Sequence, residues 1–209
     1  MATASISGIR RAATGDDLLL QETKHRCSND LQLVVSLLAL QSRRAVNAEV
    51  AQALNDAMER VAVLARARRV MQNDTPRSLN AALREVCDAL HAQAEPRSIL
   101  VTFKAGDGLD DLSVTSVTTL ALVVNELATN AIKHAFEEGR AGTVCVSTSV
   151  SAQCVVVLVD DDGLPFPELG SSSSGMGMSL AKRMMASIDG LFIPPDAGLK
   201  VFELRVPAL

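Results

Sequence analysis

Aromatic residues are scarce in this chain of 209 residues: it has no tryptophan and no tyrosine, and only 2% of it is aromatic. Because 48% of the residues are hydrophobic, we expect a folded chain whose core is built from aliphatic side chains. No window holds the ~18 uncharged apolar residues that a membrane span needs. No apolar stretch of signal-peptide type follows Arg10 and Arg11 either. We therefore predict a cytoplasmic protein that does not contact a membrane.

Paired cysteines and an excess of basic residues are also missing. The four cysteines form no C-x-x-C pair and have no histidine at zinc-finger spacing, which predicts reduced thiols in a cytosolic protein: Cys27, Cys87, Cys145 and Cys154. The net charge is −4, so nucleic acid is not the expected partner.

Proline and glycine are absent from Asp16 to Gln72, where helix formers dominate and apolar residues recur every three or four positions. Asn47 marks a break, which predicts two long helices in an antiparallel hairpin. The turn signals from Asn73 to Pro76 predict a boundary, with domains at residues 1–75 and 76–209. Because one hairpin buries its apolar stripe poorly, we expect two copies to form a four-helix bundle in a homodimer.

The second domain mixes helix and strand patterns, which predicts an α+β protein whose helices cover one face of a mixed sheet. The expected helices are residues 78–92, 113–136 and 176–188. The expected strands are residues 99–103, 144–150, 155–159, 191–193 and 199–206, with a polar turn at 106–111 and a mobile loop at 164–174.

His25 lies on the polar face of the first expected helix. At about 100° per residue, it falls opposite an apolar stripe made of Cys27, Leu31, Val34 and Leu38. An exposed histidine on a solvated helix face needs no function, and the pattern alone favours that plain interpretation. The alternative is a nucleophile, because imidazole attacks a phosphoryl group well near neutral pH. Glu22, on the same face, could then hold the ring tautomer and accept a proton.

A second set of polar residues shares one face of the helix expected at 113–136, with the spacing i, i+4, i+7 and i+8: Glu126, Asn130, Lys133 and His134. An asparagine oxygen together with phosphate oxygens suits Mg²⁺, and Lys133 could meet phosphate charge. An ordinary half-exposed helix explains the spacing equally well.

Two glycine-containing segments follow. The β-rich run from Val155 ends in acids and in Gly163, and an aspartate such as Asp161 could accept a hydrogen bond from an adenine amino group. A plain acidic turn or a metal loop would look the same. Gly175 and Gly177 open the next helix, where glycines let backbone amides approach phosphate.

In this order, the segments resemble the bacterial sensor histidine kinases of the second HisKA class. Residues 22–32, ETKHRCSNDLQ, are similar to the phosphoacceptor motif of that family. Residues 125–136 resemble its N box, residues 161–163 its first glycine box and residues 175–178 its second. The resemblance runs from Asp16 to Pro207.

The resemblance implies that His25 accepts the γ-phosphate of ATP and passes it to an aspartate of a response-regulator receiver domain. It implies that Asn130 coordinates Mg²⁺ with Glu126 nearby, and that Asp161 recognises adenine.

Gly175 and Gly177 would belong to the ATP lid and phosphate cradle. The second domain would share the fold of gyrase- and chaperone-type ATPases.

Three functions remain open. The first is an ATP-dependent histidine kinase that is fed by a separate sensor protein, and the motifs above favour it. The second is a histidine phosphotransferase adaptor that shuttles phosphate between receivers without ATP. It is favoured by Pro165 and Leu199, where the family usually has a glycine and often a threonine. The third is a non-catalytic dimeric binding module, in which replacing His25 changes no phosphate flow.

Overall fold

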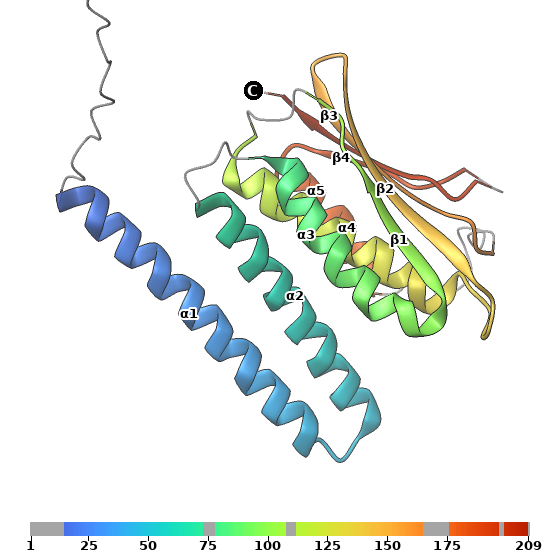
Figure 1. The fold of residues 1–209 in the computed structure, drawn as a ribbon, viewed down its shortest axis with the longest axis horizontal. Coiled ribbons are helices and arrows are strands. Elements are labelled where there is room, and N and C mark those ends of the chain that lie inside the picture. Colours follow the sequence, from blue (N-terminus) through green and yellow to red (C-terminus); the bar gives the residue numbers. More distant parts are fainter. Residues whose placement is uncertain (1–14, 73–77, 108–111, 165–175, 197–198, 209) are drawn as a thin grey trace, which may run out of the picture.

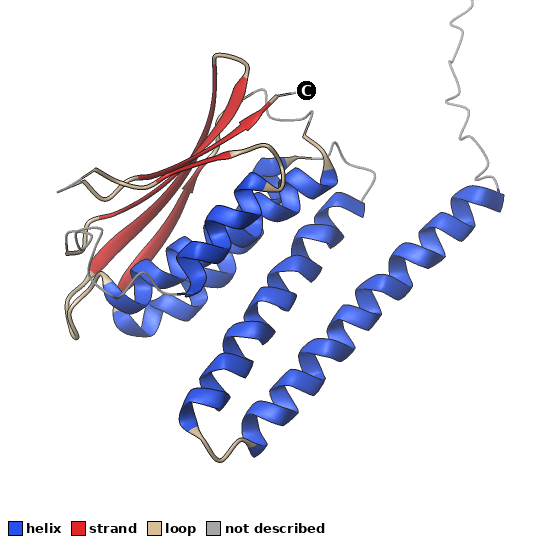
Figure 2. Cartoon of the chain, turned by 180° about the vertical axis from the view of Figure 1, so that it is seen from behind, coloured by secondary structure: helices blue, strands red, loops and turns tan. Residues whose placement is uncertain are grey.

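The computed structural model describes residues 15–72, 78–107, 112–164, 176–196 and 199–208, and the side chains within these ranges except 15–29, 70–72 and 176–177. A hairpin of two long helices packs on a layer of helices, and that layer covers one face of a twisted sheet (Figures 1 and 2). This is the predicted α+β arrangement. None of the helices in the described ranges is both long and apolar enough to cross a bilayer.

The hairpin consists of α1 (Gly15–Arg44) and α2 (Ala48–Gln72). Asn47 begins α2: its side-chain Oδ1 accepts a hydrogen bond of 2.7 Å from the backbone N–H of Glu49, and its carbonyl accepts one of 3.0 Å from Ala51. An asparagine side chain at this position satisfies one of the free N–H groups at the start of a helix. The predicted break at Asn47 is therefore confirmed.

The predicted apolar stripe on α1 is only partly covered within one chain. Leu31 and Leu38 are half-buried as expected, but Val34 is 41% exposed and Val35 is half-buried in its place. Val35 follows Leu31 by four residues, so the two side chains lie on one face. Cys27 lies within α1, but its side chain is outside the described residues.

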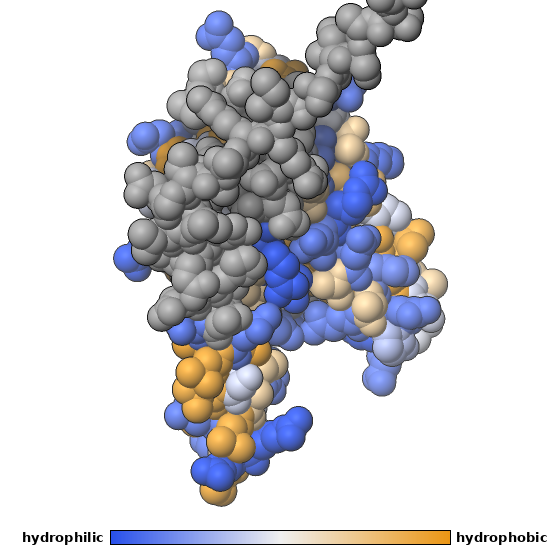
Figure 3. Space-filling model, turned by 60° about the vertical axis from the view of Figure 1, so that its left-hand side comes forward, coloured by the Kyte–Doolittle hydropathy of each residue, from blue (hydrophilic) through white to orange (hydrophobic). Residues whose placement is uncertain are grey.

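A second line of apolar side chains on the hairpin is exposed: Leu33, Leu37, Leu40, Val46 and Val50. Figure 3 shows hydrophobic surface at the lower end of the molecule, where α1 and α2 meet. Exposed apolar side chains gathered in this way are typical of a surface that contacts another protein.

The sheet has the strand order β1-β2-β3-β5-β4, with β1 and β2 parallel and the other pairs antiparallel. Its strands are β1 (Ile99–Lys104), β2 (Gly142–Ser151), β3 (Cys154–Asp161), β4 (Leu191–Ile193) and β5 (Phe202–Pro207). The turn between β2 and β3 is tight, and Ala152 and Gln153 both have positive φ angles there. The final strand begins at Phe202 rather than at the predicted residue 199. The N–H of Leu199 donates a hydrogen bond to the carbonyl of Asp196 and not to a neighbouring strand.

The helices on the covered face are α3 (Leu79–Ala94), α4 (Val114–His134) and α5 (Met176–Ala186), with a short 3₁₀ turn, η1 (Glu95–Arg97), after α3. One aliphatic core joins these helices to the sheet. It also includes Val63 and Ala67 of α2, so the hairpin packs directly on the second half of the chain. The cysteines in the described residues are free thiols: Cys87, Cys145 and Cys154.

Candidate functional site

Helix α4 carries the largest group of predicted site residues, and the structure places Glu126 and Lys133 on the same face. Ser113 begins this helix by accepting a hydrogen bond of 3.0 Å from the N–H of Ser116. The apolar side chains of α4 pack into the core, which leaves the polar face turned away from the sheet. The expected sharing of one face is confirmed for this pair.

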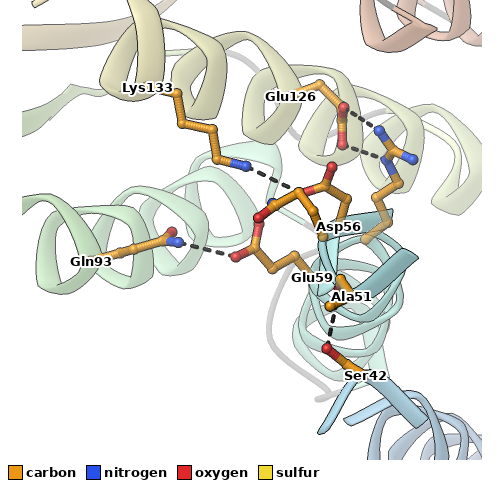
Figure 4. A network of polar contacts seen from close by, with 9 residues as sticks. Ser42, Ala51, Asp56, Glu59, Gln93, Glu126 and Lys133 are labelled. Carbon is orange, nitrogen blue, oxygen red and sulfur yellow. Dashed lines mark hydrogen bonds and ion pairs between the residues drawn. The ribbon is translucent and has the colours of Figure 1, made fainter. Parts of the chain in front are cut away.

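Both side chains contact helix α2 (Figure 4). Arg60 donates two hydrogen bonds to the carboxylate of Glu126, from Nε at 2.7 Å and from Nη2 at 2.8 Å. Lys133 Nζ lies 3.2 Å from Oδ1 of Asp56. The hydrogen bonds to Glu126 raise the pKa of Arg60. No sequence pattern indicated these two partners, Arg60 and Asp56, because they lie in the other predicted domain.

Asn130 lies between Glu126 and Lys133 along α4 and is half-buried. Within the described part of the chain, its side-chain amide makes no hydrogen bond, so its oxygen is available to a ligand. His134 is exposed in the last turn of the helix.

Asp161 is the last residue of β3, and its carboxylate accepts a hydrogen bond of 3.0 Å from the N–H of Gly163. Partial burial raises the pKa of the Asp161 carboxyl, and the opposing effects of the Gly163 N–H and Lys200 do not cancel it. Lys200 also donates a hydrogen bond to the carbonyl of Gly163. The sequence did not point to Lys200, because this residue falls inside the last expected strand, 199–206.

Gly163 allows the turn after β3 to pack closely against the C-terminal end of α4. A Cβ atom at this position would lie 2.3 Å from the carbonyl oxygen of Ala135. The same oxygen accepts a hydrogen bond of 2.6 Å from the N–H of Leu164. Asp161 is thereby fixed beside the end of α4 that carries Asn130 and His134. Gly163 thus allows a close approach of two backbones.

Four other predicted site residues are placed only in part. His25 and Glu22 lie within α1, and Gly177 lies within α5, but the surroundings of these residues are outside the described ones. Gly175 also falls outside the described residues, as do most of the loop expected at 164–174 and residues 108–111 of the polar turn.

The donors on α4 fit a magnesium ion that is shared with phosphate. In the ranges that the structure describes, no group of three or more His, Cys, Asp or Glu side chains could hold a metal by itself. Mg²⁺ prefers oxygen ligands, keeps several waters and is commonly bound by one or two protein groups together with substrate phosphates. The free amide oxygen of Asn130 suits this role, and the half-buried carboxylate of Asp161 suits an amino group of a base.

Comparison with known proteins agrees with this geometry. Residues 22–94 match the family model described as histidine kinase, and residues 115–208 match the model described as histidine kinase-, DNA gyrase B- and HSP90-like ATPase. The chain belongs to the histidine kinase family. Both matched parts occur in the order that the motifs predicted, so the predicted family is confirmed.

Among curated relatives of this histidine kinase chain is the sensor histidine kinase PdtaS of Mycobacterium tuberculosis (strain CDC 1551 / Oshkosh). It is 34% identical over 208 residues, which cover 94% of this chain and 41% of the relative. The blue-light-activated histidine kinase 1 of Erythrobacter litoralis (strain HTCC2594) is 29% identical and aligns over 87% of this chain and 50% of its own length. The chain therefore spans half or less of these relatives.

Solved structures show the same fold. The Erythrobacter litoralis EL346 blue-light activated histidine kinase superposes with a TM-score of 0.69 at 22% identity, covering 94% of this chain and 61% of that one. The separate histidine kinase domain of that protein gives a TM-score of 0.64 at 23% identity and covers 90% of each chain.

Proposed function

We propose that this chain is an ATP-dependent protein-histidine kinase of a two-component system. The observation that carries the proposal is the turn of Asp161 and Gly163 packed against the end of α4 that bears Asn130. In this proposal the half-buried carboxylate of Asp161 serves the base of the nucleotide, and the amide oxygen of Asn130 serves the metal. The match of both family models in the same chain supports it.

In the proposed reaction, a ring nitrogen of His25 attacks the γ-phosphorus of ATP. The bond from that phosphorus to the bridging oxygen breaks, and ADP leaves with the electron pair. Glu22, three residues before His25 on the same helix, holds the ring tautomer and accepts the imidazole proton. An aspartate of a response-regulator receiver then takes the phosphoryl group from His25, and this transfer restores the free imidazole.

The second half of the chain positions the nucleotide. Asn130 would hold Mg²⁺, which supplies charge neutralisation on the phosphates when it is bound. Glu126 lies one turn before Asn130 as an acidic group of the catalytic face, and Asp161 accepts a hydrogen bond from the adenine amino group. Little covalent chemistry is required of the protein, because positioning and charge neutralisation carry most of phosphoryl transfer.

The remaining predicted residues contact the phosphates and the base. Lys133 meets phosphate charge, and His134 lies at the exposed end of the same face. Gly163 shapes the base pocket, while Gly175 and Gly177 let backbone amides approach the phosphates at the start of α5.

The proposed assembly is a homodimer in which residues 1–75 supply the dimerising and phosphoaccepting hairpin and residues 76–209 supply the ATP-binding part. The exposed apolar line on α1 supports a second hairpin as its partner. A receiver domain and a separate sensor protein complete the proposed set of partners, in the cytoplasm.

Autophosphorylation with γ-labelled ATP and Mg²⁺ tests the proposal. We expect acid-labile, base-stable label on the parent chain and none on His25→Ala. His91→Gln is the matched control, because His91 is a half-buried histidine whose Nδ1 accepts a hydrogen bond of 3.3 Å from the backbone N–H of Val101. This control should keep the label. Label that persists on His25→Ala would contradict the acceptor assignment.

The second candidate is the phosphotransferase adaptor, which Leu199 favours because it stands where the family often has a nucleotide-contacting threonine. It predicts no label from ATP but transfer to His25 from a phosphorylated receiver. An unlabelled parent that is loaded in this way would replace the kinase proposal with this one.

A further inference from the structure

The face of α2 that contacts the ATPase part is charged near the start of the helix and apolar further along. Asp56, Glu59 and Arg60 in the first part are charged, whereas Val63 and Ala67 further on are fully or almost fully buried in the common core. These positions recur every three or four residues, so they lie on one side of the helix. The two parts of α2 are therefore held by different forces, ion pairs first and apolar packing afterwards.

The charged part of α2 binds two of the side chains that the proposed function assigns to Mg-ATP. Arg60, a cation, forms a two-point contact with Glu126, whose side chain is only 12% exposed. Asp56, an anion, pairs with Lys133. Arg60 thus gives Glu126 a positive partner, as Mg²⁺ would. Asp56 gives Lys133 a negative partner, as a phosphate would.

We infer that the first part of α2 and Mg-nucleotide compete for Glu126 and Lys133, so that nucleotide binding releases this part of α2 from α4. The inference rests on the proposed function and deepens it by adding a means of regulation. Any signal that moves α2 would then change the affinity for nucleotide, because coupling between two binding events is reciprocal.

The competition at α2 also concerns α1, because the two helices form one hairpin. Helix α2 lies between α1, which contains His25, and α4 (Figures 1 and 2). With the ion pairs closed, α2 separates the acceptor helix from the nucleotide helix of the same chain. The contacts of α2 with Glu126 and Lys133 would therefore transmit nucleotide binding to the hairpin that carries the acceptor helix.

The seam between the hairpin and the ATPase part is suited to opening. A cavity of about 260 Å³ lies there, and its polar lining includes Glu59, Arg66, Gln93 and Asn125. Gln93 bridges the seam by donating a hydrogen bond of 3.0 Å to Glu59 (Figure 4). Among the described residues, Arg66 Nε is buried without a hydrogen-bond partner, and burial lowers the pKa of the Arg66 guanidinium. A seam with an open pocket and an unpaired donor separates more easily than a close-packed core.

The buried side chains of Val63 and Ala67 keep the far part of α2 attached. We therefore expect a hinge between the charged and the apolar parts of this helix, rather than separation of the whole hairpin.

The test uses the full chain and the double variant Asp56→Asn/Arg60→Gln, which removes both charges and keeps side chains of similar size. Titration calorimetry with Mg-ADP should give the variant an affinity about fivefold or more higher than that of the parent. The matched control is Glu49→Gln/Arg69→Gln, which removes an exposed acid and an exposed arginine from the same helix. The control should bind Mg-ADP with the parent affinity.

Hydrogen exchange of residues 52–64 gives a second measurement. Mg-ADP should speed exchange there in the parent, whereas the double variant should exchange fast already without nucleotide. Equal affinities in parent and double variant, with unchanged exchange, would overturn the inference and leave the kinase proposal standing. Absence of binding in both proteins would instead overturn the proposed function, and the competition with it.

Discussion

Asp161 shows how the surroundings of one residue prepare it for binding. Its carboxylate sits half-buried at the end of β3, and partial burial raises its pKa despite the N–H of Gly163 and the charge of Lys200. A carboxyl whose pKa is raised on folding destabilises the fold at pH values above that pKa, and this penalty disappears as the pH falls through it. An ionised Asp161 therefore costs the fold some stability near neutral pH.

We predict that Asp161→Asn weakens Mg-ADP binding at pH 7 by about tenfold or more, because an amide presents a donor as well as an acceptor to the adenine edge. The free energy of unfolding should stay within about 1 kcal/mol of the parent value, since the buried charge is removed. Calorimetry and urea unfolding measure the two effects. The exposed neighbour Asp160 supplies the control, and Asp160→Asn should leave both unchanged.

Acidification should weaken Mg-ADP binding by the parent as Asp161 becomes protonated. Because its pKa is raised, this loss should begin at a higher pH than the ordinary aspartate value of about 3.9 implies. Binding that persists below that value would exclude an ionised Asp161 as the acceptor.

At the scale of elements, the contact between the turn after β3 and the end of α4 fixes the geometry of the site. Two backbones meet there, because the N–H of Leu164 donates to Ala135 and Gly163 has no Cβ to hold them apart. The contact joins β3, which carries Asp161, to α4, which carries Asn130.

We predict that Gly163→Ala separates these elements, because the added Cβ would lie 2.3 Å from the carbonyl oxygen of Ala135. The expected cost is roughly 1–3 kcal/mol of unfolding free energy, as for other overpacked sites, together with loss of Mg-ADP binding. Leu164→Ala is the control, because it keeps the backbone hydrogen bond and truncates a side chain that is 43% exposed. Equal stability of Gly163→Ala and the parent would show that the turn can move away from α4.

The whole molecule presents an apolar line on the outer side of the hairpin. Leu33, Leu37 and Leu40 are each about half exposed. Exposed apolar side chains gathered in this way are typical of a surface that is buried against a partner. A second hairpin packed on this line would give the four-helix bundle that the sequence predicts.

We predict that Leu37→Glu, which puts a charge in the middle of this line, converts a dimer to a monomer in analytical ultracentrifugation. Leu191→Glu is the control, since Leu191 is 59% exposed and belongs to the edge strand β4, which is on the other side of the helical layer from the hairpin (Figure 1). The control should remain dimeric. A parent chain that sediments as a monomer at all concentrations would contradict the proposed bundle.

The sequence by itself determined most elements and the family. These signals are local: helix periodicity, the absence of proline and glycine from 16–72, and an asparagine that begins the second helix. Local hydrogen bonds, such as that from the N–H of Glu49 to Asn47, decide them. The same holds for the shared face of Glu126 and Lys133, which follows from helical spacing alone. The motifs are short segments in a fixed order, so they indicated a histidine kinase before any contact was known.

Only the tertiary structure decided what those segments contact. The ion pair of Arg60 with Glu126 joins residues that are 66 positions apart in the sequence. The hydrogen bond from Lys200 to Gly163 joins residues that are 37 positions apart. No periodicity or motif encodes such distances, because they depend on how helices and strands pack. The packing of α2 likewise decides which neighbouring apolar residue of α1 is covered within one chain, Val35 rather than Val34.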